Sequence, residues 1–398
     1  MHDRSSSVGV KQLFVCRSRR LRDFVRLYDR QRHSPEELDV TSASCQYHTL
    51  DQFLDHMDGV LQRLEAATAD EGAERLVFEQ PMCVNFRKFK LQVFPDLVSD
   101  HFYRYHDSKL EVSVVWTQIR SFIKGSIEAA MLGRPLLLEE YLNVEAFPLK
   151  RCRLSPKQRQ QAYSIYQRYS MYLAERGHWD DTDRVMDLLR RSELRPLGNS
   201  FAEGRDFDKV YVDEVQDHTQ AEIALYFVAA GMKMDAVFLA GDPAQSVVEG
   251  VEFRFEEVRS VVYAMSGGLA KIERPLKLTT NFRSHSGVLN CAAAILGKLF
   301  SHFPGGAKDL GGSDSGLFTG PRPQYHMSSD WETASTDKND VLLNLLQKNQ
   351  KFVVLTSDDN SGALETKLHG RSSDMVTPVF GVKEAKGLGL LIVYKFTP

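Results

Sequence analysis

Three acidic residues follow one short apolar run in this 398-residue chain. Asp213, Glu214 and Asp217 come directly after "KVYV" at 209–212. Neighbouring carboxylates repel each other, so a positive partner or a chemical role should offset the free energy of this repulsion. An aspartate at a strand end can hold a hydrated Mg²⁺ ion, while an adjacent glutamate orients or deprotonates water. The pattern therefore predicts that Asp213 and Glu214 form part of a magnesium site.

A second polar stretch, "AGDPAQS" at 240–246, follows the apolar run "AVFLAG". Asp242 and Pro243 predict a turn, and this turn places Gln245 where an amide can sense a terminal phosphate. By itself the stretch also fits an ordinary turn.

A third stretch, "LTTNFRSHS" at 278–286, follows the apolar run that begins at Leu276. We expect Arg283 to open a helix that Ser284 or Ser286 caps. A guanidinium there can neutralise charge that develops on a transferring phosphoryl group. Each stretch alone also fits solvated surface, but three in succession after apolar runs favour a shared function.

The elements that must position these residues are short, continuous apolar runs. Such runs are typical of strands covered on both faces, so they predict a parallel α/β sheet. Ligands of open parallel sheets lie at the carboxyl ends of the strands, so we expect the three polar stretches to converge there. The runs lie at 11–16, 209–212, 236–241, 276–280, 352–356 and 390–396.

The section between the first two runs has mostly helical periodicity. Apolar residues recur three and four apart in 49–67 and 155–177, and Ser155-Pro156 is typical of a helix start. We therefore expect a large helical insertion in one sheet, a flexible Gly- and Ser-rich linker, and a smaller α/β unit. The expected segments are 1–44 (start of the first domain), 45–195 (helical insertion), 196–302 (rest of the first domain), 303–338 (linker) and 339–398 (part of a second domain).

Bulk composition narrows the class of protein. The net charge of −3 gives no sign of a whole-protein polyanion binder, so a nucleic-acid surface must be local. Five scattered cysteines without C-x-x-C spacing predict a reducing, intracellular compartment, cytoplasmic or nuclear. No apolar run reaches about 18 residues, so we expect no membrane span.

Two other stretches leave alternatives open. The segment 17–32, "RSRRLRDFVRLYDRQR", is strongly basic and fits a solvated helix face as well as a phosphate-binding one. The segment 84–94 interleaves Phe with Arg and Lys, as a single-strand groove might. Phe86, Phe89 and Val93 also share a helical face, which favours core packing.

"VDEVQD", "LAGDPAQSV" and "LTTNFRSHSGVLN" resemble motifs II, III and IV of UvrD/Rep-like superfamily 1 helicases. The stretch 11–25 is similar to their motif Ia, and "VKEAKGLGLLIVY" is similar to motif V. Stretches 114–126 and 178–189 resemble the UvrD-like module of large TPR- and ankyrin-repeat-containing proteins. The resemblance implies a RecA-like, P-loop NTPase-type parallel sheet with a large helical insertion and part of a second RecA-like domain.

The same resemblance implies ATP and Mg²⁺ as cofactors. Asp213 would coordinate the metal, and Glu214 beside it would be the catalytic base for ATP hydrolysis. Gln245 would contact the γ-phosphate, and Arg283 would be an arginine finger on it.

The resemblance also implies single-stranded DNA or RNA as partner, and other proteins through repeat regions outside this chain. Residues Lys386 and Gly387 would line the cleft of the second domain. The residues expected along the nucleic-acid strand are Ser18, Arg19, Arg20 and Arg254.

The sequence departs from the helicase pattern at several points. No G-x-x-x-x-G-K-[ST] loop precedes the run at 11–16, Gly389 replaces the acid of motif V, and no motif VI arginine follows it. We therefore expect an incomplete core, whose ATP affinity and turnover fall by orders of magnitude without that loop.

Three functions remain open from the sequence. An ATP-dependent helicase core is favoured by Asp213, Glu214, Gln245 and Arg283, whereas a catalytically inactive binding scaffold is favoured by the departures above. A nuclease that holds metal through Asp213 and Asp217 is disfavoured, because no acid beyond Glu214 is grouped with them.

Overall fold

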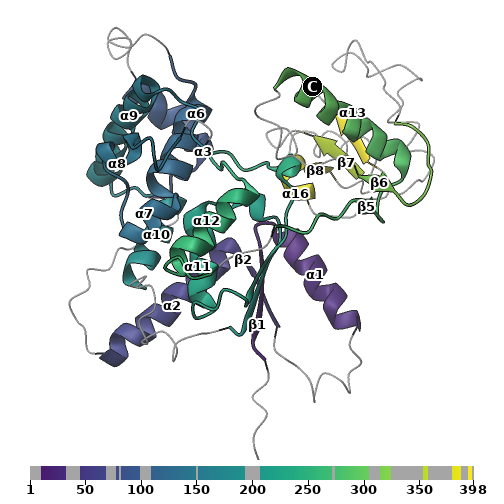
Figure 1. Cartoon of the computed structure of the whole chain (residues 1–398), viewed down its shortest axis with the longest axis horizontal. Coiled ribbons are helices and arrows are strands. Elements are labelled where there is room, and N and C mark those ends of the chain that lie inside the picture. Colours follow the sequence, from purple (N-terminus) through teal and green to yellow (C-terminus); the bar gives the residue numbers. More distant parts are fainter. Residues whose placement is uncertain are drawn as a thin grey trace, which may run out of the picture. The chain divides into compact units, whose positions relative to one another are not determined.

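The structure is a computed structural model of the chain, and its contacts divide the chain into two compact units. The first unit is Met1–Arg17 with His33–Pro275, and the second is Ser18–Arg32 with Leu276–Pro398. Figure 1 labels many of their helices and strands. The structure describes residues 10–32, 45–68, 78–79, 82–98, 109–148, 151–192, 207–270, 274–303, 314–323, 353–356, 379–386 and 393–396.

The first unit is built on a parallel sheet with the strand order β2-β1-β3-β4. Leu13 and Val15 of β1 and Val210 and Val212 of β3 are buried, as their continuous apolar runs predicted. The predicted α/β class with a parallel sheet is therefore confirmed. The strands are β1 (Gln12–Cys16), β2 (Cys45–Thr49), β3 (Lys209–Val212) and β4 (Val237–Leu239).

Strand β2 was not expected, because 45–49 was assigned to the start of the helical insertion. Its sequence "CQYHT" has no apolar run, and four of its five residues are only half-buried. The strand forms because it pairs with β1 along its whole length, from Gln12↔Cys45 to Cys16↔Thr49. Backbone hydrogen bonds to a buried neighbour thus outweigh a polar side-chain pattern at the edge of the sheet. The helical section begins only after β2.

The helical section of the first unit contains two long helices at the predicted places, α2 (Leu50–Thr68) and α9 (Pro156–Arg176). Helix α9 begins as predicted at Ser155, whose hydroxyl accepts a hydrogen bond from Gln158 N while the Gln158 side chain accepts one from Ser155 N. The remaining elements are α3 (Phe86–Lys88), the π-helical turn η2 (Phe89–Val93), α4 (Phe94–Leu97), α6 (Val112–Thr117), the π-helical η3 (Gln118–Lys124), α7 (Ile127–Leu132), α8 (Leu138–Leu142) and α10 (Asp181–Arg191).

The segment 84–94 lies in the core rather than in an open groove. Phe89 and Val93 are fully buried, and Phe86 packs against the same core. The ring of Phe89 lies 4.7 Å from that of Trp116 and 5.2 Å from that of Tyr169. Aromatic burial of this kind stabilises a core, so the preferred interpretation of this segment is confirmed.

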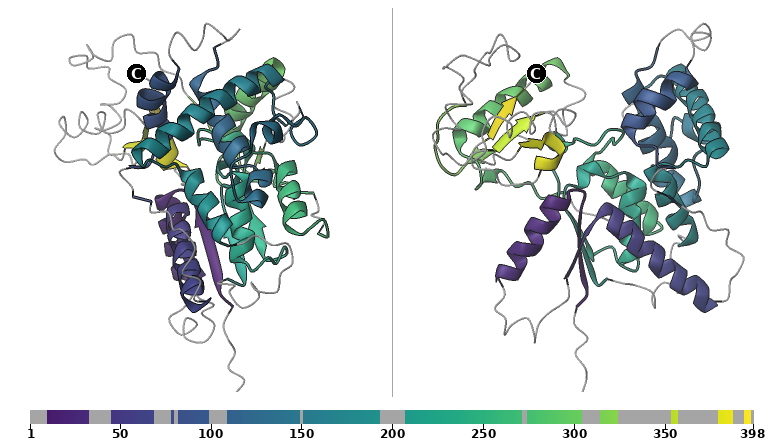
Figure 2. Two further views of the ribbon diagram at one scale, coloured as in Figure 1. Left: turned by 90° about the vertical axis from the view of Figure 1, so that its left-hand side faces the viewer. Right: turned by 180° about the vertical axis from the view of Figure 1, so that it is seen from behind.

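Helix α11 (Gln220–Ala229) connects the sheet to the helical section. Every one of its residues is buried. Figure 1 shows it beside α12 (Phe255–Met265), and Figure 2 shows the same unit from two further sides. A helix that is buried all round is a central element of a large unit. It therefore fixes the residues that precede it, which are those of the acidic stretch.

The second unit contains α1 (Arg19–Arg32), α13 (Ser286–His302), α16 (Val382–Ala385) and two small parallel sheets. Strands at 353–356 and 393–396 confirm two predicted strands. The strands are β5 (Thr280–Asn281) with β6 (Ser315–Gly316), and β8 (Val379–Gly381), β7 (Val353–Thr356) and β9 (Val393–Phe396) in the order β8-β7-β9.

The strand predicted at 276–280 is wrong for most of its length. Only Thr280 lies in a strand, while Leu276 and Leu278 are 96% and 91% exposed. An apolar run becomes a buried strand only where neighbours pair with it and cover it, and none of the described residues covers these two leucines.

Most of the predicted linker 303–338 lies outside the described residues. Among those residues, no helix has the length and hydropathy of a membrane span.

A buried polar cluster joins α12 to the helical section. Arg151 binds both carboxylate oxygens of Glu128, at 2.6 and 2.9 Å, and Gln220 donates to Glu257 on α12. Because Arg151 is already neutralised and its Nε lies 3.9 Å from Glu257, it compensates the second acid only in part. Burial therefore raises the pKa of Glu257 to about 7.

This raised pKa predicts a pH-dependent stability. Between the ordinary carboxyl pKa near 4.5 and about 7, the folded chain binds more protons than the unfolded chain, so the free energy of unfolding falls as pH rises. We expect Glu257→Gln to raise the free energy of unfolding above pH 7 by about 3 kcal/mol at most, and the gain to vanish below pH 4.5. Urea denaturation from pH 4 to 8 measures it. The exposed neighbour Glu256→Gln is the control, and equal behaviour of both variants would contradict the prediction.

Candidate functional site

The acidic stretch forms a tight turn at the end of β3. Asp213 N donates to Val15 O of β1 at 3.0 Å, which continues the sheet by one residue, and its Oδ1 accepts from Glu214 N at 2.9 Å. Glu214 has φ 60° and ψ 41°, the left-handed region that few non-glycine residues adopt. Such strain costs about 1–3 kcal/mol and persists only where the surrounding structure holds the residue in place.

Gln216 joins this turn to the second polar stretch. Its side chain is fully buried; Nε2 donates to Glu214 Oε2 at 2.5 Å, and Oε1 accepts from Asp242 N at 2.9 Å. The backbone adds a bond from Val215 N to Ala240 O at 2.9 Å. Sequence reasoning gave Gln216 no role, although an amide among carboxylates is a signal, since it is the one side chain there that both donates and accepts.

The second stretch is held by its own turn. Asp242 caps the short 3₁₀ turn η6 (Pro243–Gln245), and its Oδ1 accepts from Ala244 N at 3.0 Å. Gln245 is exposed, and its Nε2 donates to Asp242 Oδ2 at 2.8 Å. The predicted turn is confirmed. The structure thus brings Asp213, Glu214 and Gln245 onto one pair of linked loops.

Asp217 has a different task from the other two acids. It is buried, its Oδ1 accepts from Val247 N at 3.2 Å, and its carbonyl accepts from Arg17 Nε at 2.8 Å.

In the described part of the chain, no group of three or more His, Cys, Asp or Glu side chains is placed to hold a metal. A metal held by protein groups alone does not fit these residues. A Mg²⁺ ion that keeps its waters and takes one carboxylate plus phosphates does fit Asp213.

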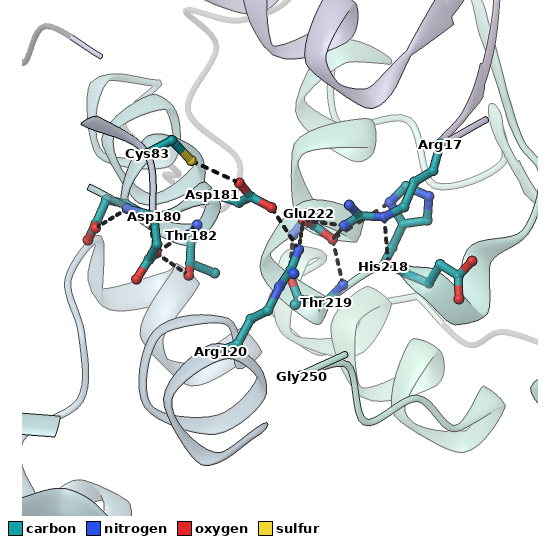
Figure 3. A network of polar contacts seen from close by, with 12 residues as sticks. Arg17, Cys83, Arg120, Asp180, Asp181, Thr182, His218, Thr219, Glu222 and Gly250 are labelled. Atoms are coloured by element: carbon teal, nitrogen blue, oxygen red, sulfur yellow. Dashed lines mark hydrogen bonds and ion pairs between the residues drawn. The ribbon is translucent and has the colours of Figure 1, made fainter. Parts of the chain in front are cut away.

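A buried ion network lies behind these loops (Figure 3). Arg17 donates to both oxygens of Glu222, at 2.8 and 2.9 Å, and Arg120 approaches the same carboxylate at 3.4 Å from another side. Burial raises the pKa of Glu222, but Arg17 and Arg120 outweigh this effect and lower the pKa to about 2. Glu222 is therefore a permanent buried charge on α11.

The network continues into the helical section. Arg120 also binds Asp181 at 3.2 Å, and Asp181 accepts from the Cys83 thiol at 3.7 Å. Burial raises the pKa of Cys83 to about 12, so the thiol stays protonated. Next to Asp181, the buried pair Lys124–Asp180 is 2.6 Å apart. These contacts connect η3 and α10 to the acidic loop.

The residues expected along nucleic acid at the start of α1 are in the second unit. Ser18 Oγ accepts from Leu21 N at 3.3 Å, so Ser18 caps the start of α1. Arg19 is exposed, and the Arg20 guanidinium lies 4.0 Å from the centre of the Phe380 ring. Arg254, in the first unit, is only 12% exposed at its side chain and lies 3.5 Å from Glu252.

The remaining predicted residues also belong to the second unit. Arg283 is exposed, and Asn281 Oδ1 accepts from the backbone N atoms of Arg283 and Ser284 at 2.9 and 2.8 Å. Lys386 follows α16 and is half-buried, whereas Gly387 lies outside the described residues. The approach of Arg283 and Lys386 to the first unit stays a prediction.

The predicted cap of the helix after Arg283 is wrong. Helix α13 begins one residue later than Ser284 allows, and its N-cap is His285, whose Nδ1 accepts from Val288 N at 3.4 Å. Ser284 N is engaged by Asn281 instead, and Ser286 is already the first helical residue. The Asn281 side chain therefore binds the backbone N–H groups just before α13, and the helix is capped at the next residue, His285.

The Glu222 network predicts a large loss of stability when its acid is neutralised. Glu222→Gln leaves Arg17 without its counter-charge and leaves Arg120 with only the more exposed Asp181, so we expect the free energy of unfolding to fall by about 3–5 kcal/mol. Glu175→Gln is the control, because its pair with Arg176 is exposed and should change stability by less than about 1 kcal/mol. Urea denaturation at pH 7 compares the two, and similar midpoints would refute the prediction.

The close approach of the two loops predicts a glycine requirement at Gly241. A Cβ at that position would lie 2.3 Å from Gln216 Oε1 and 2.9 Å from Val215 Cγ1. We expect Gly241→Ala to break the Gln216–Asp242 bond and to lower the free energy of unfolding by about 1–3 kcal/mol. In Gly59→Ala on α2 the new Cβ meets only the Arg63 guanidinium at 3.7 Å, so that variant should be as stable as wild type or slightly more stable. Thermal unfolding tests both, and a tolerated alanine at 241 would show that the loops can separate.

Comparison with known proteins supplies the family. The model of the UvrD/REP helicase N-terminal domain matches residues 35–254, a range that contains the Asp213 and Gln245 loops. The chain is also 35% identical over 248 residues to the human TPR and ankyrin repeat-containing protein 1. That match covers 60% of this chain and 8% of the human protein, so the chain spans a small part of that relative. Because the family match covers more than half of the chain, the chain belongs to the UvrD/REP helicase family and contains a helicase-like core.

Proposed function

We propose that this helicase-like core hydrolyses ATP with Mg²⁺ and couples the hydrolysis to movement on single-stranded DNA or RNA. The observation that carries the proposal is the pair of loops held together by Gln216. The Gln216 side chain joins Glu214, which follows strand β3, to the turn that carries Gln245. Such a constellation at the carboxyl ends of parallel strands is where nucleotides bind in α/β proteins.

The residues of the two loops have distinct tasks in this proposal. Asp213 takes one coordination position of Mg²⁺, which neutralises phosphate charge when it is bound. Glu214 is the base that accepts the proton of the attacking water, and its bond from Gln216 fixes the carboxylate. Gln245 contacts the terminal phosphate, so its loop responds to whether that phosphate is present. Arg283 of the second unit stabilises the charge that develops on that phosphate.

Arg17 supports a coupling between the nucleotide loops and nucleic acid. Its guanidinium binds the Asp217 carbonyl and the Glu222 carboxylate in the first unit. It also directly precedes Ser18 and Arg19, which the proposal places along the strand. In this proposal, a phosphate bound at those residues would act on the acidic loop through the Arg17 side chain.

Partner proteins are a further part of the proposal. The human relative carries TPR and ankyrin repeats in its name, and such repeats form extended surfaces for protein binding. We propose that this helicase-like core acts together with proteins bound to repeat regions of this kind.

The proposal predicts an ATPase that depends on one carboxylate. We expect the purified chain to release phosphate from Mg-ATP faster when oligothymidylate is added. Glu214→Gln should lower that stimulated rate by about 100-fold or more, because it removes the base while keeping the shape of the side chain. The difference between the two proteins is the measured quantity, so slow turnover suffices.

Asp213→Asn distinguishes metal binding from proton transfer in the same assay. We expect it to weaken Mg²⁺-dependent binding of a fluorescent ATP analogue, whereas Glu214→Gln leaves that binding intact. A rate identical in wild type and Glu214→Gln would overturn the ATPase proposal. It would favour the alternative that the chain is a binding scaffold derived from a helicase.

A further inference from the structure

The loop that follows the Gln245 turn, residues 246–254, has no regular secondary structure. The turn η6 ends at Gln245, and the next helix, α12, begins at Phe255. Gln245 and Ser246 are exposed, whereas Gly250 in the middle of the loop is buried. Buried irregular backbone needs partners for its N–H and C=O groups. The position of the Gln245 turn therefore depends on the groups that bind this loop.

Ser121 of the helical section provides two of these bonds with one hydroxyl group. Its Oγ donates to Gly250 O at 2.7 Å and accepts from Glu252 N at 2.8 Å. Ser121 is only 7% exposed, so water competes little for either bond. At the other end of the loop, Val247 N donates to Asp217 Oδ1 of the acidic turn at 3.2 Å. The loop is thus held at one end by the acidic turn and at the other by Ser121.

Gly250 brings the loop into direct contact with the helical section. Its φ is 84°, and a Cβ at this position would lie 2.5 Å from Trp116 Cδ1 and 3.1 Å from Arg120 Cδ. Figure 3 shows Gly250 beside Arg120. Glycine adopts this backbone conformation easily and leaves room for the two neighbouring side chains. The loop backbone reaches the Ser121 hydroxyl because position 250 carries no side chain.

The π-helical element η3 places Ser121 directly after Arg120. Arg120 approaches Glu222 at 3.4 Å, behind the acidic turn, whereas Ser121 binds the loop that follows Gln245. All seven residues of η3 are buried. π-Helical turns are rare and occur frequently at functional sites. One buried element of the helical section thus supports both loops of the candidate site.

We propose that Ser121 is a positioning residue for Gln245, because it fixes the loop after Gln245 and so the place of Gln245 relative to Glu214. The inference rests on the proposed function in taking Gln245 as the group that contacts the terminal phosphate. Ser121 is buried and acts only through the backbone of the loop. In this way the helical section contributes to the hydrolytic site a residue that does not touch the nucleotide.

Amide hydrogen exchange of the full chain without nucleotide, followed by mass spectrometry, tests the position of the loop. Ser121→Ala removes both hydroxyl bonds, so we expect the amides of 241–252 to exchange about tenfold faster or more, because local opening then breaks fewer bonds. Ser192→Ala is the matched control, since Ser192 is fully buried and its Oγ also donates to a backbone carbonyl, that of Leu189, at 2.8 Å. It should leave exchange in 241–252 unchanged. Equal exchange in the two variants would overturn the positioning role.

A double-mutant cycle tests whether the effect passes through Gln245. In the stimulated ATPase assay we expect Ser121→Ala to lower kcat about tenfold with KM for ATP nearly unchanged, because the Mg²⁺ contact of Asp213 is retained. In a chain that already carries Gln245→Ala, Ser121→Ala should lower kcat less than about twofold. General damage to the fold would lower kcat equally in both backgrounds, so equal losses would contradict the inference.

The two experiments separate this inference from the proposed function. A wild-type chain that releases no phosphate from ATP contradicts the proposed function, while hydrogen exchange still decides whether Ser121 fixes the loop. Unchanged exchange in Ser121→Ala contradicts the positioning role even in a chain that hydrolyses ATP.

Discussion

The carboxylate of Glu222 carries a negative charge where water does not reach it, and two arginines from distant parts of the chain surround it. One comes from the end of β1 and the other from the helical section, while Glu222 itself lies on the wholly buried α11. A buried charge is tolerable only when it is fully paired, so the three segments must meet in one arrangement. Arg17 also binds the carbonyl of Asp217, which ties the acidic loop to the same point. The position of the loop therefore depends on this interaction more than on any local preference.

The two loops in front of the network are held by few but specific bonds. Gln216 uses its donor on Glu214 and its acceptor on the backbone of Asp242, so a single buried amide fixes the spacing between the acidic turn and the Gln245 turn. Glu214 accepts a left-handed backbone to make this possible. The strain is offset by burial around it and by the sheet bond of Asp213. Rigid support behind a strained loop is a common way to keep reactive groups in a fixed geometry.

Much of the fold was predictable because the signals were local. Continuous apolar runs identified β1, β3, β4 and β7, and a Ser-Pro start with helical periodicity identified α9. Predictions failed where neighbours decide the structure. Strand β2 has a polar sequence and forms through its pairing with β1, whereas Leu276 and Leu278 look like a strand and have no cover among the described residues. The N-cap of α13 is His285 rather than Ser284, because the backbone N of Ser284 donates to the Asn281 side chain.

The sequence by itself determined the family to which the motifs of the candidate site belong, and it predicted their chemistry. The order of acids, turn and arginine after apolar runs indicated magnesium, phosphate and the helicase family, since residue types and short spacings carry that information. Only the tertiary structure decided where each acid lies and what it contacts. Asp213 and Glu214 stay at the strand end, Asp217 is turned inward to the Val247 amide, and Gln216 joins the two loops. Pairings such as Arg17 with Glu222 span about half of the chain, and no local pattern encodes contacts between residues so far apart.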